Sequence, residues 1–402
     1  MNNFAKTNSN KIRFLFVVIC LSIMSIGMPA ASLGTAWPFV REDMGLRLET
    51  AGILPIIDSI FFILICTFNG RIAMYIKGEK RALIGLILLS TCFFAFSAAP
   101  NFVFIAVLTA FVGISTGLIN NSISEYSAAN LTARQYNWTA CFFGLGATIS
   151  PIVMTQMIQL AGWRQGYVSI ASFQALAAVL MLLSIIAGVW KKSTDAVGSG
   201  ESTKTDTHDE TGKSFITDMR YKFLNLIIFF LYVGMEIATA LWIVSIMIES
   251  RGMYIGSAGF FPTVFFGCLM VGRLLFGFFA KWLSNMTVLR VAIALIAIGF
   301  TLLAFTNSII GIAIVGLGHA PMFPVLMHET PRRFGRKVLS KMVGFQLAAG
   351  SAGAALISYG VGHALSRISP EAFFPIVIII AAVVFVTNEI VAASLRRIQS
   401  SG

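Results

Sequence analysis

Hydrophobic residues occur along this chain in twelve long stretches that short polar segments separate. A helix needs roughly 20 apolar residues to cross a hydrocarbon core about 30 Å thick. The pattern therefore predicts an all-α polytopic membrane protein with twelve transmembrane helices. The stretches are 14–39, 50–75, 82–99, 102–126, 138–160, 166–190, 223–248, 255–280, 287–306, 308–327, 342–363 and 371–395.

Positive charges are distributed unequally between the gaps. Of the 29 Lys and Arg residues, 22 lie in the two ends or in every second gap, and two lie within spans. The opposite gaps hold only five: Arg41, Arg47, Arg164, Arg251 and Arg367. Short basic loops stay on the cytoplasmic side of a membrane. We therefore expect a multi-pass protein of a bacterial-type cytoplasmic (inner) membrane, with both termini in the cytoplasm.

The remaining composition narrows the class of protein. A net charge of +12 that is spread over loops beside apolar helices suits contact with anionic lipids rather than nucleic acid. The five Cys residues all lie within predicted spans and lack metal-ligand spacing. There is no Walker sequence and no nucleophile elbow, so we expect neither an ATP-driven pump nor an enzyme, and no cofactor or metal. A monomer is expected.

One polar segment divides the chain into two halves. Residues 191–222 are rich in Ser, Thr, Gly and charge, and cannot bury enough apolar surface to fold alone. We predict a cytoplasmic linker here, between a six-helix bundle at 14–190 and a second one at 223–396. The tails at 1–13 and 397–402 are predicted to be cytoplasmic. Two pseudo-symmetric six-helix bundles are typical of transporters whose substrate site lies between the halves.

A short segment occurs in both halves. Residues 70–75 (GRIAMY) recur as 277–282 (GFFAKW), 207 positions later. With the twelve-helix pattern, these segments resemble the helix 2–3 and helix 8–9 loop motif of the major facilitator superfamily. Both copies are degraded, because Met74 and Lys281 occupy the acidic position of the motif.

Other stretches resemble one branch of that superfamily, the sugar permeases that are similar to fucose and glucose permeases. They are 113–126 (GISTGLINNSISEY), 134–138 (RQYNW), 232–236 (YVGME) and 316–321 (GLGHAP). The resemblance implies the superfamily fold and sugar permease-like symport.

The chain departs from that branch in its N-terminal half. Asn120 stands where the branch usually carries an acid, and Ala140 and Phe143 stand where it carries His and Tyr. Each sugar hydroxyl left without a partner costs about 1–3 kcal/mol in a dry site. We therefore expect a less polar substrate than a typical sugar.

Few ionisable residues lie within the spans. Inserting such a residue into the membrane is costly, so it usually lines a substrate or ion pathway or pairs with another charged residue. Glu236 lies about 18 Å into its helix, close to mid-bilayer, and is the first candidate for proton coupling and substrate binding. The alternative is a structural carboxyl paired with a neighbouring helix. Asp58, about 12 Å from the outer end of its helix, is a second proton-coupling candidate that could instead pair with an arginine.

His319 lies about 15 Å into its helix, in the sequence Gly-His-Ala-Pro. Proline lacks a backbone donor, so this helix should bend near 318–324 and turn His319 toward the central cavity. The imidazole would then bind substrate or carry protons. The alternative is a histidine that is hydrogen-bonded to a nearby carbonyl.

The remaining candidates have simpler roles. Arg71 and Arg273 lie one to two turns from cytoplasmic helix ends, where long side chains reach the interface, and we expect them to clamp a gate. Four uncharged residues are candidates for substrate binding, with helix-to-helix contacts as the alternative: Asn120, Asn121, Trp242 and Gln346.

Together these features predict a secondary transporter that moves a small neutral organic solute, sugar-like or moderately apolar, by alternating access, with proton coupling. One alternative is drug or metabolite efflux by proton antiport. An alternative from another class is a transporter-like sensor or scaffold that moves no solute.

The charge distribution makes a testable prediction about topology. In a cysteine-free background, cysteines placed at Ser199 and Ser340 should react with an impermeant thiol reagent only from the cytoplasmic side, and one at Asn101 only from outside. Labelling of Asn101 from the cytoplasmic side alone would overturn the assignment of spans.

Overall fold

The computed structural model describes residues 2–131, 133–190, 218–279, 283–335 and 338–400. These residues form twelve helical spans that are long and apolar enough to cross a membrane, and no β-strand. The predicted all-α, twelve-helix fold is thereby confirmed, and the protein is a multi-pass membrane protein. Most of the predicted linker, residues 191–217, lies outside the described residues.

Six spans form the first half. Its elements are α1 (Asn2–Gly27), α2 (Pro29–Met44), η1 (Leu48–Gly52), α3 (Ile53–Tyr75), α4 (Gly78–Ser97), α5 (Phe102–Asn130), α6 (Ala133–Ala161) and α7 (Trp163–Ile186).

Six further spans form the second half. Its elements are α8 (Met219–Glu249), α9 (Ile255–Ala258), α10 (Phe260–Phe279), α11 (Asn285–Phe305), α12 (Ile309–His319), α13 (Met322–Phe334), α14 (Leu339–Arg367), η3 (Pro370–Ala372) and α15 (Phe373–Ser400).

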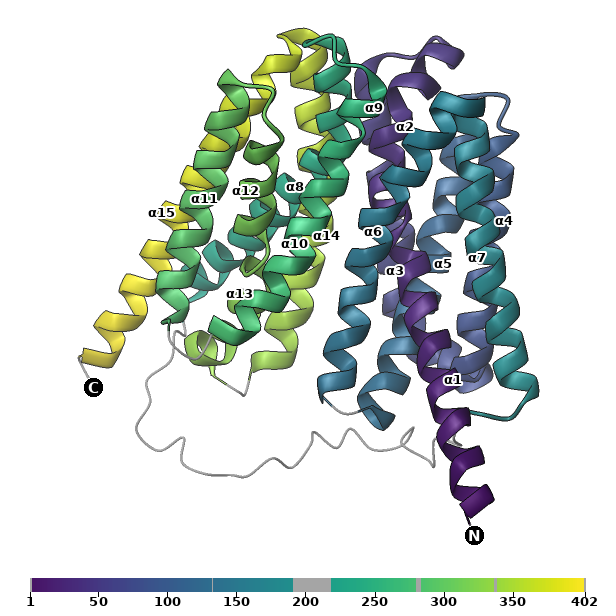
Figure 1. Cartoon of the computed structure of the whole chain (residues 1–402). Helices are drawn as coiled ribbons and strands as arrows, with labels where there is room; N and C mark the ends of the chain where they lie inside the picture. The colour runs from purple at the N-terminus through teal and green to yellow at the C-terminus, as the bar shows by residue number, and fades with distance from the viewer. Residues whose placement is uncertain (1, 132, 191–217, 280–282, 336–337, 401–402) are drawn as a thin grey trace.

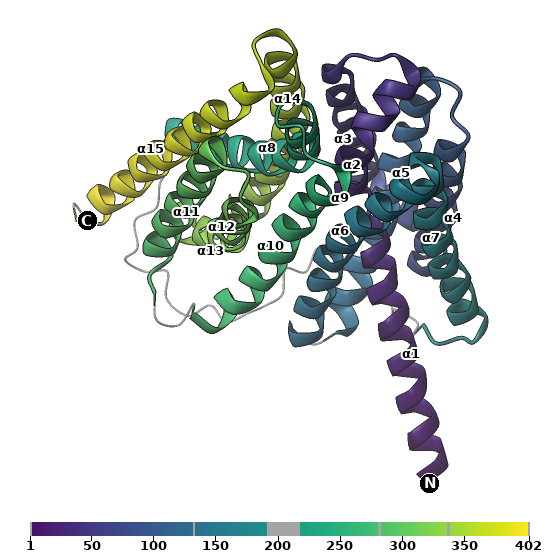
Figure 2. The ribbon, with the colours of Figure 1, turned by 45° about the horizontal axis from the view of Figure 1, so that its top comes forward.

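The two halves stand side by side, and both chain termini lie on the same side of the molecule (Figures 1 and 2). We call this the terminus side and the opposite one the far side. Each half is a bundle whose helices pack mainly on their own neighbours. The helices α2, α3 and α6 of the first half also pack against α8, α14 and α10 of the second.

Two spans are interrupted at a proline. In the first, α1 ends at Gly27 and α2 begins at Pro29. In the tenth, α12 ends at His319 and α13 begins at Met322, with Pro321 between them. Proline removes a backbone donor and its ring crowds the preceding turn, which interrupts the helix. The predicted bend near 318–324 is therefore present.

The halves meet closely on the far side because glycines allow their backbones to approach. A Cβ atom at Gly34 of α2 would overlap the carbonyl oxygen of Ala240 of α8, and one at Gly52 would lie 2.7 Å from Cα of Tyr359. An ion pair of 2.8 Å between Arg41 and Glu249 also joins the halves here. No side chain larger than hydrogen fits these positions without a shift of backbone.

The terminus-side ends of two of these helices have open space around them. A Cβ atom at Gly70 of α3 or at Gly344 of α14 would meet nothing within 4 Å. The close approach to α14 is therefore made by η1, at Gly52 and Tyr359, whereas the Cβ directions of Gly70 and Gly344 point into open space.

This difference makes a testable prediction. Gly52→Ala should hold the halves apart on the far side, because the added methyl group meets the backbone of Tyr359 rather than a flexible side chain. Gly70→Ala is the matched control, since its methyl group enters open space. Spin labels at Asn101 and Phe305, which are exposed on different halves, should report a longer distance only in the first variant. Equal distances in both variants would contradict this account.

Candidate functional site

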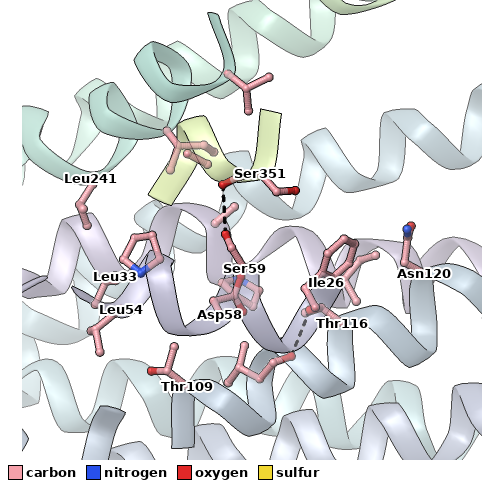
Figure 3. Close-up of a pocket in the computed structure, with 18 of the residues that line it drawn as sticks. Ile26, Leu33, Leu54, Asp58, Ser59, Thr109, Thr116, Asn120, Leu241 and Ser351 are labelled. Atoms are coloured by element: carbon pink, nitrogen blue, oxygen red, sulfur yellow. Dashed lines mark hydrogen bonds between the residues drawn. The ribbon is translucent and has the colours of Figure 1, made fainter. Parts of the chain in front are cut away.

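A cavity of about 440 Å³ lies between the two halves. Every span of the first half contributes to its lining, and the second half contributes residues of α8, α13 and α14. Figure 3 shows the part of it around α3, where Asp58 and Ser59 lie beside Thr109 and Thr116 of α5. A volume of this size is typical of sites for small organic ligands.

The cavity wall is largely apolar. Seven of its lining residues are aromatic: Phe62, Phe93, Phe96, Phe143, Tyr167, Phe229 and Phe323. Most of the hydroxyl groups are already engaged, since Thr109 and Thr116 donate to carbonyls of their own helix at 2.8 and 3.0 Å. Ser59 donates across the halves to the carbonyl of Ser351 at 3.3 Å. Few polar atoms are left to bind a ligand.

Three of the predicted site residues line this cavity: Asp58, Asn120 and Gln346. Asp58 is half-buried and faces the space between the halves with Ser59. Gln346 is buried, and its amide is held by Thr330 in a pair of hydrogen bonds of 2.9 and 3.2 Å.

Asn121 and Trp242 are two of the predicted site residues that do not line the cavity. The Asn121 amide donates to Sγ of Cys66 at 3.4 Å, so it joins α5 to α3. The Trp242 ring is completely buried, and its indole nitrogen donates to the carbonyl of Ser358 at 2.9 Å. The Trp242 ring packs between α8 and α14 and does not line the cavity, so the structure places this candidate for substrate binding apart from the cavity wall.

Helical spacing explains these positions. The residues of α8 that line the cavity follow one another at intervals of four: Phe229, Val233, Ile237 and Leu241. Residues four apart share a face of a helix. Glu236 and Trp242 come one position before and one after members of this series, so they lie on adjacent faces.

Glu236 belongs to a separate polar cluster inside the second half. Its carboxylate accepts a hydrogen bond of 2.8 Å from the Tyr232 hydroxyl. The Tyr232 and His319 rings lie 6.0 Å apart, and Arg273 lies within electrostatic range of both. We call Tyr232, Glu236, Arg273 and His319 the second-half cluster. Neither Glu236 nor His319 lines the cavity.

His319 was expected to face the central cavity, but its side chain does not line the cavity. Its Nδ1 lies 2.9 Å from the carbonyl oxygen of Val315, one turn earlier, and Phe265 packs against its ring at 5.6 Å between centroids. The break after His319 opens the helix, but these contacts direct the ring into the second-half bundle. Its Nε2 atom is buried without a hydrogen-bond partner among the described residues.

The two arginines that were expected to clamp a gate have different surroundings. Arg273 lies in the second-half cluster, whereas Arg71 is exposed at the terminus side, with its guanidinium 5.9 Å from the centre of the Phe68 ring. Among the residues described, no group of three or more His, Cys, Asp or Glu side chains is placed to hold a metal ion.

Comparison with known proteins identifies the family. Residues 15–356 match the model of the Major Facilitator Superfamily. The chain belongs to this superfamily. Its members are membrane transporters, so the chain is a transporter of small molecules across a membrane and not an enzyme.

Individual relatives agree with this assignment. The chain is 23% identical over 359 residues to the glucose/mannose transporter GlcP of Bacillus subtilis, covering 85% of this chain and 86% of that protein. Its fold is similar to that of the nucleoside transporter NupG, with a TM-score of 0.74, 11% identity and coverage of 94% and 99% of the two chains. Its fold is also similar to that of a peptide transporter in complex with sulfate, with a TM-score of 0.71 and 12% identity. This match covers 96% of this chain and 95% of that chain. The predicted resemblance to sugar permeases of the superfamily is confirmed.

Several residues that line the cavity were not predicted from the sequence. Phe62, Tyr167 and Phe323 come from three different helices, and each is an ordinary apolar or aromatic residue within a hydrophobic stretch. The regular spacing along α8 is a usable signal, but core-facing residues have the same spacing. Only the packing of the two halves distinguishes a cavity wall from a bundle core.

The placement of Trp242 can be tested. Trp242→Phe removes the hydrogen bond to Ser358 and leaves its carbonyl without this donor, so the melting temperature in detergent should fall, with a loss of about 1–3 kcal/mol. The apparent substrate affinity should stay within about twofold, because the ring does not line the cavity. Unchanged stability with a large loss of affinity would return Trp242 to the binding site.

Proposed function

We propose that the chain is a secondary active transporter that carries its substrate in the cavity between the halves by alternating access. The observation that carries this proposal is the position of the cavity, which both halves line. The halves are in close contact on the far side, while Gly70 and Gly344 have open space on the terminus side. The structure therefore corresponds to a state that is closed on the far side. Rocking of the two halves against each other would open the far side and close the terminus side.

The terminus side is proposed to be cytoplasmic, in a bacterial-type inner membrane. The support is the excess of Lys and Arg in the loops and ends on this side, because short basic loops remain in the cytoplasm. In this proposal the close contact on the far side closes the outer end of the cavity. We further propose that the protein works as a monomer surrounded by lipid, since each monomer holds a complete cavity.

The proposed substrate is a small and moderately apolar organic solute. Seven aromatic rings line the cavity, and the hydroxyls of Thr109 and Thr116 are engaged by their own helix. A polyhydroxylated sugar would leave several hydroxyls unpaired here, at about 1–3 kcal/mol each. The same apolar wall favours drug or metabolite efflux as a second candidate function.

Proton coupling is proposed to run through Glu236. This carboxyl lies in the second-half cluster beside a tyrosine hydroxyl, a histidine and an arginine, all of which can respond to its charge. The cluster adjoins the face of α8 that lines the cavity, so a change of charge there can alter how α8 packs. Asp58 is the second acid proposed to take part.

The coupling role of Glu236 is tested by Glu236→Gln in proteoliposomes. The amide keeps the size of the side chain but cannot titrate, so uphill accumulation driven by a proton gradient should be lost while exchange of substrate down its own gradient continues. Glu389→Gln is the control, because Glu389 pairs with Arg290 away from the cavity. Normal accumulation in the Glu236 variant would make its role structural. Binding without any exchange in the unaltered protein would instead favour a sensor or scaffold.

A further inference from the structure

Among the described residues, one acidic side chain lines the inter-half cavity, and no charged group is paired with it. Among the described residues that line the cavity, Asp58 is the only Asp, Glu, Lys, Arg or His. Asp58 has no hydrogen bond or ion pair with any other described residue. The acids elsewhere in the spans differ, since Glu236 accepts from Tyr232 and Glu125 binds Arg81 at 2.5 Å.

The surroundings of Asp58 offer little that stabilises a negative charge. Its backbone packs closely on Gly113 of α5, where a Cβ atom would overlap the Asp58 carbonyl oxygen. The cavity-facing groups of the elements packed against it are hydroxyls and amides, including Thr109, Thr116 and Ser351. Tyr167 is the only other titratable group among the described lining residues. An isolated ionised carboxylate in such a place is costly unless a counter-charge is present.

Aromatic rings in the same cavity supply a second feature. Phe93, Phe96 and Tyr167 form a cluster with centroid distances of 5.3, 5.6 and 5.4 Å. Phe62 follows Asp58 by one turn of α3 and lines the cavity as well. The faces of aromatic rings attract cations, most strongly where water is excluded. A carboxylate and several rings around one small cavity recognise an organic ammonium or similar cation.

We propose that the ligand of this cavity is an organic cation of the amine class, bound through Asp58 and the surrounding aromatic rings. This inference rests on the proposed transport function, because it assigns the charge of the solute that the same cavity carries. When the cation is absent, a proton on the carboxyl of Asp58 removes the unpaired charge. Binding of the cation then releases that proton to water, so each bound cation replaces one proton.

A pair of probes with the same shape separates charge from size. Benzyltrimethylammonium carries a fixed positive charge, and neopentylbenzene has the same shape with a neutral carbon in place of nitrogen. Binding of each to the purified full-length protein is measured in phosphatidylcholine nanodiscs, with empty nanodiscs as the blank. The variants are Asp58→Asn and, as a matched control, Asp43→Asn, since Asp43 pairs with Arg164 outside the cavity.

The proposal predicts selective binding of the cation by the unaltered protein. Asp58→Asn should weaken that binding at least about tenfold, whereas Asp43→Asn should leave it unchanged. Affinity for the cation should fall as the pH is lowered in the unaltered protein, because protons compete for Asp58, and should be independent of pH in Asp58→Asn. A fixed charge cannot titrate, so this dependence reports on the protein.

Other outcomes overturn the inference. Equal or tighter binding of neopentylbenzene, or cation binding that survives Asp58→Asn, would show that the carboxyl does not select charge. Failure of both probes to bind at millimolar concentration would also overturn it. Counterflow in proteoliposomes is measured separately. Transport of a neutral solute but not of the cation would support the proposed transport function and reject the cation as the ligand. Cation binding without counterflow would support the cation as the ligand and reject the transport function.

Discussion

The close approach of the two halves on the far side is the contact on which the other features of the structure depend. Apolar side chains give no hydrophobic advantage between helices in lipid, so association relies on close packing and on polar contacts. Gly34 and Gly52 remove the side chains that would hold α2 and η1 away from α8 and α14. Because the backbones meet there, the residues on the terminus side of this contact enclose a cavity between the halves.

Polar interactions within each half differ in kind from those between the halves. On the terminus side of the first half, Arg81 binds Asn69 and Glu125, both at 2.5 Å, and so joins α3, α4 and α5. In the second half, buried Arg333 donates to Asn388 at 2.8 Å. Networks of this kind are costly to break once buried. Each half is thereby stabilised as a unit, while a few contacts such as the Arg41–Glu249 pair join the two units.

The acids of the membrane interior are divided between two environments. Glu236 lies among groups that can share or oppose its charge, whereas Asp58 lies in the cavity among hydroxyls, amides and aromatic rings. Depth along the helix favoured Glu236, but depth does not decide access to the cavity. One position of difference along α8 changes the direction of a side chain by about 100°. That rotation places Ile237 on the cavity wall and Glu236 in the second-half cluster.

The number of spans and the break near Pro321 could be predicted from the sequence, because each depends on a local property: the length of an apolar stretch or a missing backbone donor. The sequence also indicated the superfamily through short motifs. Which of the candidate residues reach the cavity depends on tertiary packing. Asp58, Asn120 and Gln346 do, and Trp242 and His319 do not, because the direction of a side chain and its partner on another helix arise from packing between segments far apart in the chain.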